Sequence, residues 1–561
     1  MAIIRWAGFA GENRNLHPKL LPASVGVTSL NQKPGKGDFR PWRSPTTVTS
    51  APTGTKTIYR MGRDVANESN YWLTWPTVVH AVRDFNEEDV TERTFYTGDG
   101  VPKVTDNTIA LASAPYPTAN RPLGLPVPAA APTAAKAVGT WTGDVVTHFY
   151  VYTYVNDWGW ESAPSPVSTQ IDRESDATVT LSGFSAPPAG NYQINKIRLY
   201  RTQTGASGAT EFFFLREITI GTTTTVDDNR TLGEVLETTT WLPPPADLSF
   251  LTPMWNGMLA GISGNAVRFC EAYVGYAWPV AYDVLPPDST PVALGTFGQN
   301  LLVLTTGNPL LVVGTGPDAL DQVPVEFAQA CLAPESVVSM GNGVAWASSD
   351  GLCWYGTNGP EIITAKAIGR DEWRAMRPET IIGRNYEGLY VGSYEPVPGQ
   401  PRKMFMIAPG SPDGAFFLDL GYEAMYFDKL LDQLFVLDGT DIKKWDSGSA
   451  MTASATSKEF LHTEPVTFAM AQVVADTYPV TVRVTAKGLD TNTVSALLTK
   501  GISGIDSPAT GEIRYTKSVT SRKNFKLPTG FKAYDWQIDL TSQYPVQGLA
   551  VASTIEEIKQ S

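Results

Sequence analysis

One pattern recurs in WNGMLAGISGNAVRFCEA (residues 255–272), GQNLLVLTTGNPLLVVGT (298–315) and GNGVAWASSDGLCWYGTNGPEIIT (341–364). Each stretch holds an apolar strand, a turn containing Gly-Asn or Asp-Gly, and a second apolar strand. Such residue pairs accept the backbone angles that tight hairpin turns require. The pattern therefore predicts antiparallel hairpins, and an all-β fold.

The same pattern continues in YEGLYVGSYE (386–395), KMFMIAPGSPDGAFFLDL (403–420) and DQLFVLDGTDIKKWDS (432–447). The hairpins follow one another at a spacing of roughly 40 residues, which is the blade period of a β-propeller. Short β-like runs at 57–112, including IYRMG and YWLTW, predict a first blade, and residues 247–459 the remaining ones. The sequence thus predicts a propeller of about six blades.

Two segments interrupt the predicted propeller after its first blade. Residues 113–137 are rich in Pro and Ala and predict a semi-rigid linker, because proline cannot donate to a strand ladder. Residues 138–246 alternate cleanly in THFYVYTYVN, NKIRLYRT and TEFFFLREITI. This alternation predicts an inserted β-sandwich, and the order of its segments resembles fibronectin type III modules.

The two ends of the chain differ from the predicted blades. Residues 1–56 hold many turn signals and predict an extended arm. The arm carries Trp6, Phe9, Phe39 and Trp42, and we expect these aromatic side chains to pack on a neighbouring subunit or another partner protein. Residues 460–561 hold longer alternating strands and predict a C-terminal β-sandwich-like region.

Charge and cysteine content restrict the possible functions. The chain has 561 residues and a net charge of -13, which opposes tight binding to DNA phosphates. Its three cysteines have no CxxC spacing, which predicts buried free thiols. The absence of a disulfide pattern also predicts that the chain is synthesised in a reducing cytoplasm. No run is apolar enough to span a membrane, and no secretory signal is recognised at the start.

The sequence has no clear catalytic, cofactor-binding or metal-binding motif. The four histidines lie far apart in the sequence, and GxSxG is absent. Gly314, Gly316 and Ala319 imitate a dinucleotide loop, but strand-like sequence follows where a helix should begin. We therefore assign no catalytic, cofactor-binding or metal-ligating residue. Trp158 and Trp160, in a predicted sandwich loop, indicate either stacking on sugar rings or a further protein contact.

Several stretches together resemble one protein family. They are WAGFAGENRNLHPKLLPASVGVTSLNQKPGKGDFRPWRSP (6–45), ERTFYTGDGVPKVT (92–105), MGNGVAWASSDGLCWYG (340–356), LPTGFKAYDWQIDL (527–540) and VASTIEEI (551–558). The chain is similar in these stretches to the tail nozzle, or tail tubular B type, proteins of short-tailed double-stranded DNA phages. The fibronectin-like insert is a departure from that pattern.

The resemblance implies a structural protein of the virion tail without enzymatic activity. It implies a hexameric ring that docks on the tail adaptor, with tail fibres or spikes as further partners, and through which DNA is ejected without being tightly bound. An acidic lumen would repel the passing phosphates. The alternative is a propeller tail spike that binds or hydrolyses glycans, since propellers can bring carboxylates together at their mouth.

Overall fold

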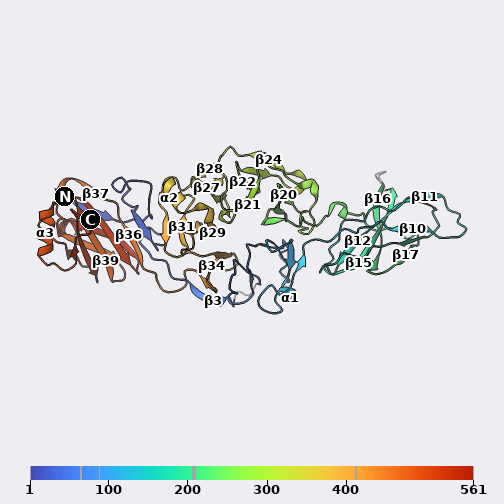
Figure 1. Cartoon of the computed structure of the whole chain (residues 1–561), viewed down its shortest axis with the longest axis horizontal. Helices are drawn as coiled ribbons and strands as arrows, with labels where there is room; N and C mark the ends of the chain where they lie inside the picture. The colour runs from blue at the N-terminus through green and yellow to red at the C-terminus, as the bar shows by residue number, and fades with distance from the viewer. Residues whose placement is uncertain are drawn as a thin grey trace.

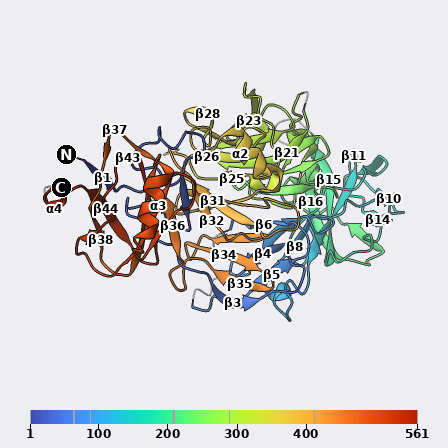
Figure 2. The same cartoon turned by 60° about the vertical axis from the view of Figure 1, so that its left-hand side comes forward.

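The computed structural model describes residues 2–62, 66–86, 89–204, 210–287, 289–410 and 413–559. The fold is all-β, as predicted, with 43% of residues in strands and 7% in helices. Figure 1 shows an elongated molecule with three parts along its long axis. The C-terminal strands and the N-terminus lie at one end, many small sheets in the middle, and the inserted sandwich at the other end. Figure 2 shows the same order from a second side.

Seven small sheets make up the middle part. The first sheet is β4 (Thr57–Arg60) with β5 (Trp72–Trp75), and the second is β6 (His80–Arg83), β7 (Thr94–Thr97), β8 (Lys103–Thr105) and β9 (Arg121–Pro122). The third is β18 (Ser249–Pro253), β19 (Leu259–Ser263) and β20 (Ala266–Phe269); the fourth is β21 (Pro291–Phe297), β22 (Asn300–Thr305), β23 (Leu310–Val313) and β24 (Asp321–Pro324); and the fifth is β25 (Val338–Ser339), β26 (Gly343–Ala347), β27 (Leu352–Gly356) and β28 (Gly359–Ile362). The sixth is β29 (Ile382–Tyr386), β30 (Leu389–Tyr394), β31 (Lys403–Ile407) and β32 (Phe416–Leu418), and the seventh is β33 (Ala424–Asp428), β34 (Gln433–Asp438) and β35 (Asp441–Lys444), extended by β3 (Thr46–Ser50). The hairpin turn predicted at Gly264-Asn265 is confirmed by the antiparallel register around it. The hairpin predicted at Asp438-Gly439 is present one residue later, with Gly439-Thr440 as the loop and Asp438 paired with Asp441.

The seven sheets follow one another in a cycle. A hydrophobic cluster fills each space between consecutive sheets, from β4–β5 against β6–β7 through to β33–β35. The last cluster joins the two ends of this series, because Phe435 on β34 packs with Ile58 on β4 and Trp72 on β5. Strand β3 then adds to the outer edge of the last sheet by pairing with β35. Residues near the start of the chain therefore complete the sheet formed near residue 440.

The boundaries differ from the sequence-based prediction in several respects. The sandwich begins before residue 138, because β10 (Thr133–Lys136), within the predicted linker 113–137, pairs with β14 (Val179–Ser182). Residues 57–112, predicted as one blade, belong to two sheets, so seven sheets take part in the cycle where the sequence predicts about six blades. The connection between β5 and β6, residues 76–79, leads from one sheet into the next. In addition, β9 at Arg121–Pro122 lies within the predicted linker 113–137, where it pairs with β8.

The N-terminal segment is woven into the chain's own sheets. Strand β1 (Ile3–Trp6) pairs with β44 (Val546–Ala552), and β2 (Thr28–Leu30) lies between β32 and β36 (Ala453–Thr456). Trp6, Phe9 and Phe39 belong to the C-terminal hydrophobic core. Trp42 packs with Trp445 in the cluster between the last two sheets. All four side chains predicted to pack on a neighbouring subunit or another protein are thus buried within their own chain.

The C-terminal part has two facing sheets around one core. One sheet holds β1, β44, β38 (Met470–Ala475) and β42 (Phe525–Lys526). The other contains β36, β37 (Phe460–Val466), β39 (Val480–Lys487), β40 (Ile505–Asp506), β41 (Ile513–Val519) and β43 (Ala533–Ser542), and it is continuous through β2 with β29–β32. Val473 from the first sheet and Ile538 from the second lie in the shared core. The helices are short: α1 (Asn107–Ala110), α2 (Arg370–Ala375), α3 (Thr491–Thr499) and α4 (Ile555–Lys559). Among the described residues, no helix has the length and apolarity needed to cross a membrane.

The inserted sandwich has its own core. Its sheets are β10 (Thr133–Lys136), β14 (Val179–Ser182) and β17 (Thr224–Asp227); β12 (Tyr150–Asn156), β15 (Ile194–Thr204) and β16 (Thr210–Thr219); and the pair β11 (Val145–His148) and β13 (Ile171–Glu174). Alternate residues of β12, Tyr150, Tyr152 and Tyr154, point into this core. Asp227 is fully buried, and it accepts hydrogen bonds from Tyr150 at 2.8 Å and from Arg201 at 2.7 Å.

Aromatic side chains join the sandwich to the cycle of sheets. Trp160 stacks on Tyr276 with ring centroids 4.4 Å apart, and it shares a cluster with Phe95 on β7. The Arg121 guanidinium lies 3.8 Å from the ring centre of Trp158. Trp160 is buried and Trp158 half-buried. The two tryptophans predicted as contacts with another protein therefore meet residues of the same chain.

Candidate functional site

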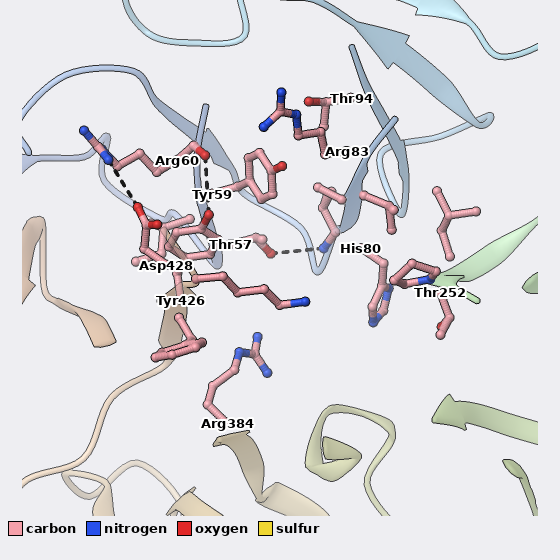
Figure 3. A pocket seen from close by; sticks show the side chains of 18 of the residues that line it. Thr57, Tyr59, Arg60, His80, Arg83, Thr94, Thr252, Arg384, Tyr426 and Asp428 are labelled. Atoms are coloured by element: carbon pink, nitrogen blue, oxygen red, sulfur yellow. Dashed lines mark hydrogen bonds and ion pairs between the residues drawn. The ribbon is translucent and has the colours of Figure 1, made fainter. Parts of the chain in front are cut away.

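A cavity of about 590 Å³ lies at the centre of the cycle of sheets. Each of the seven sheets contributes lining residues from its first strand or from the turn just before it. Figure 3 shows the side chains that converge there from β4, β6, β18, β29 and β33. A volume of this size is typical of sites for small molecules. The cavity is therefore the candidate functional site of the middle part.

Ion pairs cross the cavity wall between different sheets. Arg60 at the end of β4 donates to Asp428 at the end of β33 over 3.2 Å, and both side chains are buried. His80 on β6 lies 3.1 Å from the carboxylate of Glu335, which precedes β25. Within one sheet region, Arg83 lies 4.0 Å from Glu92. The first two pairs tie together sheets that are distant in the sequence.

The environment of Glu335 favours its charged form. Burial alone would raise the pKa of this carboxyl, but the hydrogen bond from His80 and the charges of His80 and Arg384 hold the pKa below its ordinary value of 4.5. His80 also packs against Phe250 with ring centroids 4.1 Å apart, which fixes the imidazole beside the carboxylate. Glu335 is thus a charged partner of basic groups and does not have the raised pKa typical of a general acid.

Arg384 and Lys429 contribute basic groups to the cavity without an ion-pair partner within 4.0 Å among the described residues. The Arg384 guanidinium donates to the backbone carbonyls of Met425 and Gly383, at 2.8 and 2.6 Å. Figure 3 shows this guanidinium directed into the cavity. Lys429 is exposed, beside exposed Leu430, so this part of the lining borders solvent.

Phenols, hydroxyls and apolar side chains complete the lining. Burial raises the pKa of Tyr59 to about 12 and that of Tyr426 well above its ordinary value, so both phenols are neutral at pH 7. Thr57 accepts a hydrogen bond from the backbone N–H of Val79 at 3.0 Å, which links β4 to the start of β6. The wall also holds Phe250, Leu294 and Phe427. The surface combines basic and hydroxyl groups with aromatic faces.

The cysteine side chains lie away from the cavity lining. The described residues contain no group of three or more His, Cys, Asp or Glu side chains placed to hold a metal ion. Cys270, Cys331 and Cys353 are buried and free, and burial raises the pKa of each thiol to about 12. A buried thiol of this kind is a poor nucleophile at neutral pH. The polar groups of the cavity lining are basic side chains, ion-paired carboxylates and hydroxyls.

Sequence reasoning did not find this cavity. The six residues proposed from the sequence, Trp6, Phe9, Phe39, Trp42, Trp158 and Trp160, lie in hydrophobic clusters, and none of them lines the cavity. The cavity residues come from positions 57 to 430 and carry no motif. The sequence did contain one usable signal. The first strand of each successive hairpin sheet, or the turn before it, supplies residues to the central cavity. Basic residues on these first strands, such as Arg384 on β29, could therefore have been grouped as candidate cavity residues.

Comparisons with known proteins add little. No protein-family model matches the chain, and no curated protein matches it. Among solved structures, the AfRom2 CNH domain is similar at a TM-score of 0.24 and 7% identity, covering 49% of this chain and 90% of that one. PorZ of Porphyromonas gingivalis has a TM-score of 0.23 and 10% identity, covering 51% of this chain and 40% of that one. An extracellular domain of a putative hybrid two component system from B. thetaiotaomicron has a TM-score of 0.24 and 8% identity, covering 94% and 63%. Likeness this distant carries no argument about function.

Proposed function

We propose that this chain is a structural subunit of the tail nozzle of a short-tailed double-stranded DNA phage. The observation that carries the proposal is the three-part, elongated architecture, with a different β-sandwich at each end of a central cycle of sheets. Different surfaces on two flanks are what a head-to-tail contact requires, and such contacts generate rings when the rotation closes. The resemblance of the sequence to nozzle proteins supplies the biological setting and the hexameric count.

The central sheets are, in this proposal, a β-propeller. Their hairpins succeed one another around one cavity, and the outer strand of the last sheet comes from the other end of the series, at β3. The stretch that carries most of the resemblance, residues 6–45, supports a structural role, because it connects the last sheets with the C-terminal core. The inserted sandwich is proposed as a fibronectin type III-like module that projects from the ring.

The acidity of the chain fits a conduit for DNA. With a net charge of -13, a ring of this protein repels phosphates over roughly a Debye length of 8 Å at physiological salt. DNA then passes without being held, because tight binding needs basic side chains that displace counterions. The tail adaptor would meet the ring on one face, and fibres or spikes are further candidate partners.

The glycan-hydrolysing tail spike is less well supported. A glycosidase needs one carboxyl as an acid and a second carboxylate free to act as base or nucleophile. In the described cavity lining, Glu92, Glu335 and Asp428 each face Arg83, His80 or Arg60 within 4.0 Å. Ionised carboxylates that are already paired with basic side chains favour a structural role for the pairs over catalysis.

The proposal is tested by locating the protein in phage particles. Antibody raised against the purified chain, coupled to gold, is applied to tailed particles from the host that carries the gene. We expect label at the tip of the tail on its axis, and quantitative mass spectrometry should give about six copies per particle, as closed head-to-tail rings require a fixed number.

Particles that carry label only at the periphery of the tail would indicate a spike and contradict the proposal. Absence of the chain from purified particles would contradict it as well. As an enzymatic control, the purified chain is incubated with the host's surface polysaccharide. We expect no release of reducing ends, and release abolished by Glu335→Gln would support the hydrolase in its place.

A further inference from the structure

The central cavity has more basic than acidic side chains, although the whole chain is acidic. Its described lining includes Arg60, Arg83, Arg384 and Lys429 against Glu92, Glu335 and Asp428, with His80 as a further group. The chain as a whole carries a net charge of -13. The described lining thus has one more basic than acidic side chain. Low-dielectric walls strengthen the field of such a charge toward an entering anion.

Arg384 has the donors needed to hold an anion. A guanidinium has five N–H groups. Two of them bond to the carbonyls of Met425 and Gly383, and these bonds fix the plane of the group. The remaining donors have no carboxylate within 4.0 Å among the described residues, and the guanidinium faces the cavity (Figure 3). A fixed guanidinium with free paired donors suits a carboxylate or phosphate group.

Other lining groups fit an organic molecule that carries such an anion. Lys429 is exposed and lies at the solvent-facing part of the lining, where it can meet an entering negative charge. Phe250 and Phe427 bring aromatic faces. The hydroxyls of Thr57, Thr94 and Thr252 each donate to a backbone carbonyl of the protein, so toward a ligand they can only accept hydrogen bonds. The volume of about 590 Å³ has room for a small molecule and none for a folded chain or a DNA duplex.

We infer that the central cavity binds a small organic molecule through an oxyanion group, a carboxylate or a phosphate, with Arg384 as the main contact and Lys429 as the second. This binding site is independent of the proposed role in the tail, since each could exist without the other. The cavity pairs Arg60–Asp428 and His80–Glu335 hold the surrounding sheets and leave Arg384 and Lys429 for the ligand.

The test is calorimetric titration of the full chain at low salt with three probes: inorganic phosphate, glucuronate and glucose. We expect saturable binding of at least one of the two anions and none of glucose. Binding of phosphate alone indicates a phosphorylated ligand, and binding of glucuronate alone indicates a carboxylate. Binding should weaken as salt is raised, because screening reduces the attraction between charges. Glucose as the only binder, or no binding by any probe, would overturn the inference.

Two cavity variants and two matched controls locate the site. Arg384→Gln should weaken anion binding about tenfold or more, as expected for loss of hydrogen bonds between charged groups. Lys429→Gln should weaken it less, and because Lys429 is exposed this variant should keep the wild-type melting temperature. Arg483→Gln and Lys532→Gln alter exposed residues of the C-terminal part and should bind like wild type. Unchanged affinity in both cavity variants would overturn the assignment even if the wild type binds anions.

Discussion

Arg60 and Asp428 show how single residues hold the cycle of sheets together. They pair where the first and last sheets of the cycle meet, and both side chains are almost fully buried. Removing one member of such a pair leaves a buried charge without its partner. The pair is therefore a point at which a small change in sequence should have a large effect on the free energy of unfolding.

We expect Asp428→Asn to destabilise the chain by about 3 kcal/mol or more, since it removes the buried charge-to-charge contact between Asp428 and Arg60. The control is Asp438→Asn, which removes an exposed pair with Lys443 on the same sheet. That change should cost about 0 to 1 kcal/mol. Denaturant unfolding of the three proteins measures both values. Equal stability of the two variants would show that the Arg60–Asp428 pair does not fasten the sheets.

Glu335 should make stability depend on pH in the acid range. Its pKa in the folded chain is lowered, despite burial, by His80 and Arg384, from an ordinary value of 4.5. The stabilisation is therefore fully present above pH 4.5 and is lost as the pH falls through the folded pKa. We expect wild type to melt higher than Glu335→Gln at pH 7, and this difference to shrink below pH 4.5. A difference that is constant between pH 7 and 3 would contradict the assignment.

At the scale of elements, hairpins were predictable and the associations between distant strands were not. Gly439 has a positive φ of 62° in the turn between β34 and β35, and the Asp-Gly pair that requires it is visible in the sequence. The pairing of β3 with β35 joins residues almost 400 positions apart, and no local pattern encodes it. The cavity depends on such associations, so its members could not be grouped from the sequence.

The N-terminal segment illustrates the same limit. Its aromatic residues predicted a contact with another surface, and that surface proved to be the chain's own core. We therefore expect Trp6→Ala to cost about 3 to 5 kcal/mol, as for a fully buried aromatic side chain. Leu20→Ala, in the same segment but exposed, should stay within about 0.5 kcal/mol of wild type. Urea unfolding compares the two. A stable Trp6→Ala chain would mean that β1 is not needed for the C-terminal core.

The inserted sandwich is an element that should fold alone. Its core is built from Tyr150, Tyr152, Leu199 and their neighbours within the insert, and Asp227 finds Arg201 and Tyr150 there. We expect a fragment of residues 130–246 to unfold in one cooperative transition when heated, followed by circular dichroism. The fragment with Asp227→Ala should melt lower, because Arg201 and Arg173 lose their buried partner. A fragment without a cooperative transition would show that the sandwich needs the Trp160 contacts.

At the scale of the whole molecule, the sandwich leaves and re-enters the cycle of sheets at neighbouring points. A Cβ atom placed on Gly124 would lie 2.8 Å from the side chain of Pro243, so the two ends of the insert touch. The insert can therefore extend the molecule along its axis without opening the cycle. Because the two ends of the insert meet at Gly124 and Pro243, removal of the insert should shorten the molecule and leave the central sheets in place.

The last prediction concerns that length. A compact chain of 561 residues has a radius of gyration of about 24 Å, and we expect solution X-ray scattering of the monomer to give a clearly larger value, because the two sandwiches lie at opposite ends. Replacing residues 127–241 by a short Gly-Ser linker should bring the radius close to the compact value for the shorter chain, about 22 Å. The shortened chain should still bind the anion that the full chain binds, since no cavity residue lies in the insert. A full-length monomer measuring about 24 Å would show that the sandwich folds back onto the central sheets, and the flank it offers to a neighbouring subunit in the proposed ring would then be lost.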